Sequence, residues 1–181
     1  MPTDKSSRWA WALTGSGHFL DETVALFRGL ENLDVFLSRA AVEVLRMYKR
    51  KIEISDSSRI FYDKTASAAP VGAFYYGVYH TVIVAPATSN AVAKFVYGIS
   101  DDLVSNVFAH AGKTRVPTIV FACDTAPELL TMAPKGPVKV FPRTIDLENR
   151  ERLGIFEGVT VIDSPGELAV AVAHRQNELR R

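Results

Sequence analysis

The chain has 181 residues, 48% of them hydrophobic, and its 21 basic and 20 acidic side chains nearly cancel. This length suits one domain over residues 1–181, and the balanced charge argues against nucleic acid as a partner. The single cysteine, Cys123, excludes an intrachain disulfide framework. No apolar run approaches the roughly 18–20 residues that span a bilayer, and the polar start lacks a signal-peptide pattern, so we expect a cytoplasmic protein without a membrane partner.

The first predicted strand, residues 9–13, leads into a turn that contains Gly15, Ser16 and Gly17, and then into a helix over residues 20–30. A strand, a glycine-rich turn and a helix in this order can hold an anion on free backbone N–H groups. The same pattern also suits a tight turn that holds no ligand. The turn lacks both the dinucleotide fingerprint and the P-loop lysine, which argues against a nucleoside triphosphate.

Residues 34–37 are predicted to form the second strand, followed directly by Ser38 and by a helix over residues 40–48. Ser38 is expected to cap this helix. It can instead, or also, contact a ligand, because it follows the carboxyl end of a strand. The basic run 49–51 is predicted to be a solvated helix end, where cations complement the helix dipole.

Residues 52–69 carry a weak signal and predict no regular element. Pro70 can open a short helix that carries Phe74, Tyr75, Tyr76 and Tyr79. So many aromatic rings are costly to leave exposed. We expect them to fill the core, to cover a subunit interface, or to form the wall of a pocket for a flat ligand.

A polar loop follows the third predicted strand, residues 81–85. Thr88 or Ser89 is expected to cap the helix that comes next. The side-chain amide of Asn90 offers donors and an acceptor to a planar heterocycle. In an open α/β sheet, ligands bind outside the carboxyl ends of the strands, which is where this loop is predicted to lie.

A second helix start is predicted shortly after this loop. Gly98 is expected to end the first helix, and Ser100 or Asp101 to cap another over residues 102–112. Two helix N-termini are therefore expected within reach of one loop. Their N–H groups can face a shared ligand.

The apolar run 117–123 predicts a strand buried on both faces, and it ends in a polar loop that begins at Asp124. Residues 128–138 contain two prolines and a glycine and are predicted to be a mobile connection or a lid. Residues 138–141 and 159–162 are predicted to be further strands.

The last helix is expected to begin with a capping box at Ser164 and to run close to the C-terminus. Strands and helices thus alternate along the chain. This alternation predicts an α/β fold: a Rossmann-like, doubly wound, mostly parallel sheet with helices on both faces.

The usual signs of side-chain catalysis are missing from the sequence. The four histidines are scattered, the one cysteine has no partner at zinc-ligand spacing, and no metal site is predicted. A Gly-x-Ser-x-Gly elbow is absent, and Cys123 at the end of a buried strand is expected to be a small core residue. If the protein is an enzyme, a bound cofactor is expected to carry the reaction.

Three separated segments resemble a known family. Residues 86–90, Pro-Ala-Thr-Ser-Asn, are similar to the Pro-Ala-Ser-Ala-Asn-Thr signature of the homo-oligomeric flavin-containing cysteine decarboxylase superfamily. Lys94 follows this segment, and residues 98–103 resemble the Gly-Ile-Cys-Asp-Asn-Leu signature of the same superfamily. The turn at residues 15–17 and Ser38 fall where its phosphate loop and second flavin-contacting loop lie. The resemblance implies a three-layer flavoprotein fold, FMN between subunits and a homo-oligomer built from trimers.

The resemblance also implies which residues bind FMN. The turn at residues 15–17 would bind the phosphate, and residues 88–90 the ribityl chain and the ring edge. The helix start at residues 100–105 would favour the anionic reduced flavin without a nearby lysine. The implied FMN-binding residues are Gly15, Ser16, Gly17, Ser38, Ala40, Pro86, Ala87, Thr88, Ser89, Asn90, Ser100, Asp101, Asp102 and Ser105.

Two departures argue against a flavin-dependent decarboxylase or prenyltransferase. Gly72 stands where the decarboxylases carry a catalytic histidine, and residues 122–125 replace their Pro-x-Met-Asn substrate clamp. Residues 142–149, with Leu153 and residues 158–161, are instead similar to the archaeal-type flavoproteins, a branch that includes the flavoprotein dihydromethanopterin reductase. This similarity implies hydride transfer from reduced FMN to dihydromethanopterin or a related dihydropterin, giving a tetrahydro one-carbon carrier.

A pterin substrate needs a pocket of its own, for which Tyr75, Tyr76, Asp124 and Arg143 are the candidates. Arg143 can equally form a structural ion pair with Asp146. The electron donor is expected to be NAD(P)H or a ferredoxin-type protein. Two alternatives stay open: an electron-transfer flavoprotein without a pterin substrate, and a non-enzymatic protein that stores FMN.

Overall fold

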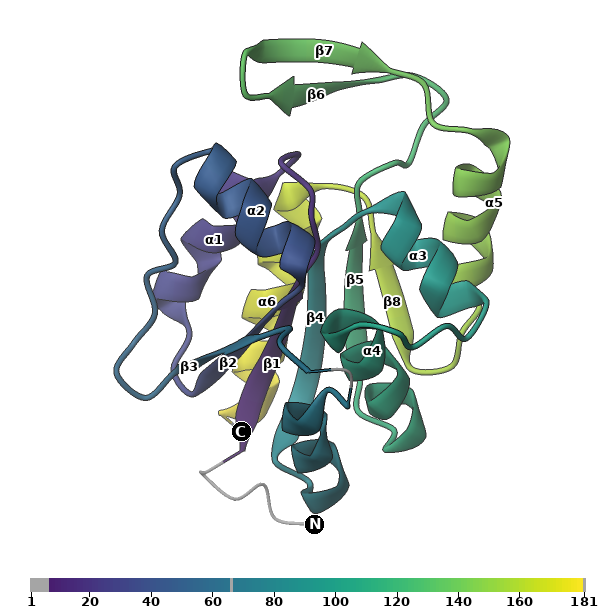
Figure 1. The fold of residues 1–181 in the computed structure, drawn as a ribbon. Coiled ribbons are helices and arrows are strands. Elements are labelled where there is room, and N and C mark those ends of the chain that lie inside the picture. Colours follow the sequence, from purple (N-terminus) through teal and green to yellow (C-terminus); the bar gives the residue numbers. More distant parts are fainter. Residues whose placement is uncertain (1–6, 66, 181) are drawn as a thin grey trace.

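The computed structural model describes residues 7–65 and 67–180. At its centre is a parallel sheet of six strands in the order β3-β2-β1-β4-β5-β8 (Figure 1). Strands β1, β4 and β5 are almost continuous buried runs, as expected of a sheet covered on both faces. The strands are β1 Arg8–Leu13, β2 Leu33–Leu37, β3 Arg59–Tyr62, β4 Tyr79–Ala87, β5 Thr118–Ala122 and β8 Val159–Ile162.

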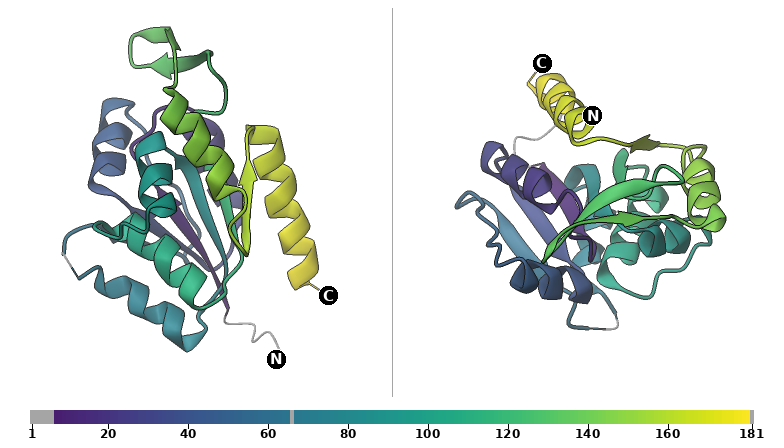
Figure 2. Two further views of the ribbon diagram at one scale, coloured as in Figure 1. Left: turned by 90° about the vertical axis from the view of Figure 1, so that its right-hand side faces the viewer. Right: turned by 90° about the horizontal axis from the view of Figure 1, so that it is seen from above.

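Helices cover both faces of the sheet (Figure 2), which confirms the predicted Rossmann-like α/β fold. One face packs against α1 (Leu20–Ala25), the 3-10 helix η1 (Leu26–Gly29), α2 (Arg39–Met47) and α6 (Pro165–Leu179). The other packs against the 3-10 helix η2 (Ala69–Tyr76), α3 (Ser89–Val96), α4 (Leu103–Lys113) and α5 (Thr144–Leu153). Among residues 7–65 and 67–180, none of the helices combines the length and the apolar character that crossing a bilayer requires.

The structure differs from the sequence-based expectations at the margins of the sheet. Residues 59–62, where no element was predicted, form the edge strand β3. The connection predicted over residues 128–138 is largely an antiparallel hairpin of β6 (Leu129–Ala133) and β7 (Gly136–Val140). Residues 138–140 therefore belong to this hairpin instead of the central sheet, and Phe141 lies just after it. Tyr79, expected on the short helix after Pro70, is instead the first residue of β4. The hairpin lies across the carboxyl edge of the sheet when the molecule is seen from above (Figure 2).

Three of the predicted N-caps agree with the structure and one does not. The Ser164 hydroxyl accepts the N–H of Glu167 at the start of α6, as predicted, but the Glu167 carboxylate accepts the N–H of Asp163, so the reciprocal bond of a capping box is not formed. The side chains of Ser38 and Thr88 accept hydrogen bonds from the first turns of α2 and α3, as expected of N-caps. The start of α4 is capped by Asp102, and not by Ser100 or Asp101. Asp102 Oδ1 accepts the N–H of Ser105 at 2.7 Å, and the Ser105 hydroxyl accepts the N–H of Asp102 at 3.0 Å. This reciprocal capping box fixes the helix one residue later than predicted.

The buried carboxylate of Asp34 joins the four strands β1, β2, β3 and β4. Asp34 on β2 is fully buried and accepts hydrogen bonds from Arg8 on β1, at 2.9 and 2.6 Å. It also accepts hydrogen bonds from Arg59 on β3, at 2.9 and 2.5 Å, and from the Tyr79 hydroxyl on β4, at 2.8 Å. These residues lie at or next to the first residues of their strands, so the cluster holds the amino edge of the sheet.

Candidate functional site

The chain reverses its direction across the sheet between β1 and β4. From β1 it proceeds to β2 and β3 on one side, and from β4 to β5 and β8 on the other (Figure 1). Loops that leave the carboxyl ends of β1 and β4 therefore diverge and open a crevice. Ligands of doubly wound folds bind at such a point.

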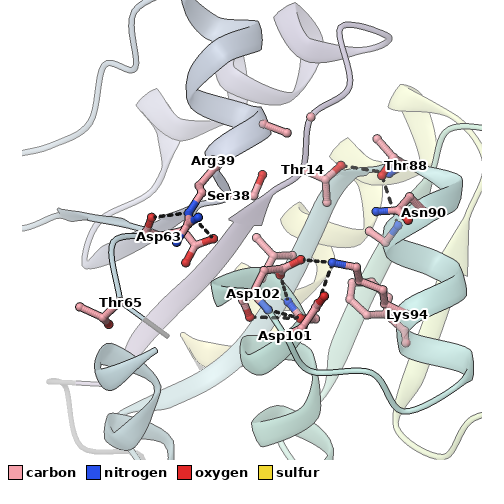
Figure 3. Close-up of a pocket in the computed structure, with 16 residues that line it drawn as sticks. Thr14, Ser38, Arg39, Asp63, Thr65, Thr88, Asn90, Lys94, Asp101 and Asp102 are labelled. Atoms are coloured by element: carbon pink, nitrogen blue, oxygen red, sulfur yellow. Dashed lines mark hydrogen bonds and ion pairs between the residues drawn. The ribbon is translucent and has the colours of Figure 1, made fainter. Parts of the chain in front are cut away.

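A cavity of about 540 Å³ occupies this crevice (Figure 3). Its wall comes from the turns after β1, β2, β3 and β4 and from the start of α4. The predicted FMN-binding residues that line it are Gly15, Ser38, Ala40, Thr88, Asn90, Asp101, Asp102 and Ser105. Those that lie outside its wall are Ser16, Gly17, Pro86, Ala87, Ser89 and Ser100.

Hydrogen bonds tie the three predicted turns together at the carboxyl edge. The Thr14 hydroxyl donates to the carbonyl of Pro86 at 2.7 Å and accepts the N–H of Thr88 at 3.0 Å. The N–H of Ser38 donates to the carbonyl of Leu13 at 3.2 Å. The turns after β1, β2 and β4 are thus held in a fixed mutual position before any ligand enters.

The turn after β1 approaches α2 closely because it contains glycine. A Cβ atom on Gly15 would lie 2.5 Å from the Cβ of Ala40, too short for a real contact. Within the described residues, the N–H groups of Gly15, Ser16 and Gly17 donate no hydrogen bond. Consecutive free N–H groups next to a cavity suit an anion.

Ser16 is turned towards the interior of the protein. Its hydroxyl accepts the N–H of His18 at 3.1 Å and the thiol of Cys123 at 3.2 Å. Burial raises the pKa of the Cys123 thiol to about 12, so the thiol stays protonated at neutral pH. This agrees with the expectation that Cys123 is a core residue, and its contact with Ser16 links the end of β5 to the turn after β1.

Lys94 is the main residue of this cavity that sequence reasoning left out of the site. Its ammonium group lies 2.6 Å from a carboxylate oxygen of Asp101 and 2.6 Å from one of Asp102. The expectation that no lysine lies near the start of α4 is wrong, because Gly98 ends α3 and turns the chain back towards Lys94. The helix start also carries the Asp102 carboxylate, which offsets the positive end of the dipole.

A second cation lies near the turns that follow β1 and β2. Arg39 follows Ser38 directly, and its guanidinium lies 3.7 Å from the carboxylate of Asp63 (Figure 3). Arg39 was visible beside the predicted cap and could have been named from the sequence. Asp63 and Thr65 follow β3, and without that strand nothing in the sequence pointed to them.

The four candidate pterin-contacting residues do not come together within one chain. Tyr75 and Tyr76 are exposed on η2, which precedes β4 and so lies at the amino edge of the sheet. Asp124 lies at the carboxyl edge, where it accepts the hydroxyl of Ser89. Arg143 forms the ion pair with Asp146 that the sequence allowed, at 2.9 and 2.7 Å. A pterin pocket made of these four residues stays a prediction.

Comparisons with known proteins agree with this geometry. A family model described as Flavoprotein matches residues 2–178. DmrB of Burkholderia xenovorans, solved in complex with FMN and described as a cubic protein cage for redox transfer, is 46% identical over 98% of this chain and 99% of its own, with a TM-score of 0.87. A dihydromethanopterin reductase (acceptor) of Methanosarcina mazei is 29% identical over 87% of this chain and 95% of its own.

The decarboxylase side of the resemblance is confirmed at the level of the fold. The phenylacrylic acid decarboxylase of Aquifex aeolicus is 21% identical over 87% of this chain and 81% of its own, with a TM-score of 0.63. At this identity the likeness concerns architecture alone. The family model matched over residues 2–178, together with the likeness to DmrB, shows that the chain belongs to the Flavoprotein family.

Proposed function

We propose that this protein is an FMN-dependent oxidoreductase that reduces dihydromethanopterin, or a related dihydropterin, to the tetrahydro form. The observation that carries the proposal is the convergence of three turns on one cavity, beside free N–H groups at residues 15–17. Similarity to a reductase of this name and to an FMN-binding redox protein supports it.

The residues present fit FMN. The N–H groups at residues 15–17 and the guanidinium of Arg39 suit a phosphate, since hydrogen bonds that involve a charged group contribute roughly 1.5–3 kcal/mol each. Thr88 and Asn90 offer hydrogen-bonding groups to a polyol chain and the edge of a heterocycle. Phe95 and Val104 line the same cavity and offer apolar surface to a flat ring.

When bound, FMN supplies hydride chemistry, so the chain itself needs no nucleophile. The side chains around the cavity fit a role in binding instead of in nucleophilic attack. Cys123 is buried and protonated, the Ser38 hydroxyl caps α2, and Lys94 is paired with Asp102. The chain's own residues then bind and orient the cofactor and hold a pterin against it. Asn90 and Ser38 would act in binding, and the pterin contacts would come from Tyr75, Tyr76, Asp124 and Arg143.

A homo-oligomer built from trimers, with FMN between subunits, would complete the site. The separation of Tyr75 and Tyr76 from the cavity within one chain favours this arrangement, because a neighbouring subunit can bring a second copy of these rings to the cavity. Large apolar side chains at Tyr76 and Ile155 are more than 80% exposed, as expected of surfaces covered by another subunit. The relative described as a protein cage supports a homo-oligomeric assembly.

The test is a half-reaction under anaerobic conditions. Protein carrying FMN is reduced with dithionite, freed of excess reductant, and mixed with dihydromethanopterin or dihydrofolate. Reoxidation of the flavin absorbance with stoichiometric tetrahydropterin is the expected result. Reoxidation by a ferredoxin or a dye but by neither pterin would replace the proposal with an electron-transfer flavoprotein. Protein that is purified colourless and takes up no FMN would remove both readings.

A further inference from the structure

The cavity has a cation at each of two ends, and the two cations differ in their surroundings. Arg39 follows Ser38 and is mostly exposed, whereas the side chain of Lys94 is only 19% exposed (Figure 3). Water screens an exposed charge far more than a half-buried one. Lys94 is therefore the cation whose charge a ligand in the cavity feels more strongly.

Lys94 also lies next to apolar residues of the cavity lining. It precedes Phe95 on α3, and Phe95 and Val104 contribute apolar lining there. Arg39, which suits a phosphate, lies on the other side of the cavity (Figure 3). A ligand with a polar, phosphorylated tail and a flat ring is thus expected to place its ring on the side of Lys94.

The two carboxylates paired with Lys94 are held very differently. Asp102 is fixed, because its other oxygen accepts the N–H of Ser105 in the capping box of α4. The Asp101 side chain is 59% exposed, and the structure records Lys94 as its ion-pair partner. Releasing Asp101 to water therefore costs little, whereas releasing Asp102 would uncap the helix.

We propose that Lys94 compensates the negative charge that the flavin ring gains on reduction, and that Asp101 is the exchangeable partner which it releases. This inference rests on the proposed FMN-dependent function. Uptake of two electrons and one proton makes the ring one unit more negative. Exchange of Asp101 for the ring keeps Lys94 paired with two negative groups in both redox states, while Asp102 holds it in place.

Other charged groups around the cavity do not duplicate this arrangement. Arg39 and Asp63 also line it, and they pair with each other at 3.7 Å. Burial alone lowers the pKa of Lys94, but the hydrogen bonds with its two carboxylates raise it above the ordinary value, so the ammonium stays charged at neutral pH.

The test measures the midpoint potential of bound FMN against a reference dye at several pH values. Lys94→Met is expected to make the potential more negative and to move the break in its pH dependence, which marks protonation of the reduced ring, to higher pH. Lys94→Arg keeps the charge and should restore both towards native values. Asp101→Asn removes the competing carboxylate and should make the potential less negative.

Matched controls carry the same charge changes on exposed sites. Lys113→Met lies at the far end of α4, and Asp56→Asn lies in the loop before β3. Both should keep the native potential, and an equal shift in Lys113→Met would overturn a contact role for Lys94. A native potential and break in FMN-loaded Lys94→Met would also overturn it. If Lys94→Met loses FMN, an unchanged midpoint potential in Asp101→Asn would overturn the contact role of Lys94 instead. Absence of FMN from the unaltered protein would instead refute the proposed function.

Discussion

Replacing Asp34 with asparagine should destabilise the whole domain without touching the cavity. Asparagine keeps the size of the side chain but removes the charge that faces two guanidinium groups. Arg8 is largely buried and would lose its charged partner, keeping its hydrogen bond to the carbonyl of Ser57. Arg59 is 53% exposed and can turn towards solvent.

The expected loss follows from this difference. Removing one partner of a buried ion pair costs about 3–5 kcal/mol, because the remaining charge stays desolvated. Solvent screening at Arg59 places the cost of Asp34→Asn at the lower end, about 3 kcal/mol. For a chain of this length, that corresponds to a fall in Tm of roughly 6–12 °C.

Urea unfolding followed by circular dichroism measures this loss directly. Asp56→Asn is the control, since Asp56 is exposed in a loop and should stay within about 0.5 kcal/mol of the native protein. A free energy of unfolding for Asp34→Asn within 1 kcal/mol of native would show that the cluster adds little. The reasoning about desolvated arginine would then be wrong.

The contribution of Asp34 to the free energy of unfolding should also depend on pH. Burial alone raises the pKa of Asp34, but hydrogen bonds from both arginines and from Tyr79 outweigh it and hold the pKa below the ordinary value of 3.8. A carboxyl whose folded pKa is depressed stabilises the protein above its unfolded pKa and loses that contribution as pH falls through the folded pKa. The gap between native and Asp34→Asn should therefore be full at neutral pH and shrink below about pH 4.

Three further changes test the turns and the hairpin. Gly15→Val drives a side chain into Ala40, so FMN per chain should fall while circular dichroism stays native; unchanged occupancy would remove Gly15 from the site. Ser38→Ala loses the cap of α2 and should lower the free energy of unfolding, measured in urea, by about 1 kcal/mol. An unchanged free energy of unfolding would show that the cap contributes little. Tyr48→Phe removes the 2.7 Å hydrogen bond to the carbonyl of Met132, so limited proteolysis of the hairpin should quicken with little change in Tm; native cleavage rates would show that other contacts hold it.

The inner strands and the turns after them could be predicted from the sequence, because strands that are buried on both faces consist mainly of apolar residues. The central residues of β1, β4 and β5 are buried and mostly apolar, and each strand is followed by a loop that contains polar residues. Ser38 and Thr88 were recognisable as caps for the same local reason: each comes directly before a helical pattern.

What the sequence did not reveal depends on contacts between distant residues. Strand β3 is half exposed and four residues long, so it carries neither alternation nor a long apolar run. Ser100, Asp101 and Asp102 can each cap a helix. The reciprocal bond with Ser105 selects Asp102, and composition alone does not rank the three. The role of Lys94 emerges only once the chain has turned back at Gly98.

The two edges of the sheet therefore have different roles: the amino edge stabilises the fold, and the carboxyl edge binds the ligand. At the amino edge, Asp34 is fully buried and both of its carboxylate oxygens are hydrogen bonded. At the carboxyl edge, the N–H groups of residues 15–17 have no acceptor among the described residues, and the exposed Asp101 can leave Lys94. Binding energy at one edge and folding energy at the other should then be additive, as for distant sites. FMN should raise the free energy of unfolding of Asp34→Asn by the same amount as in the native chain. The size of this increase is set by the FMN concentration relative to the Kd of FMN. A smaller increment in thermal shift titrations would show that loosening the amino edge is transmitted through the strands to the turns.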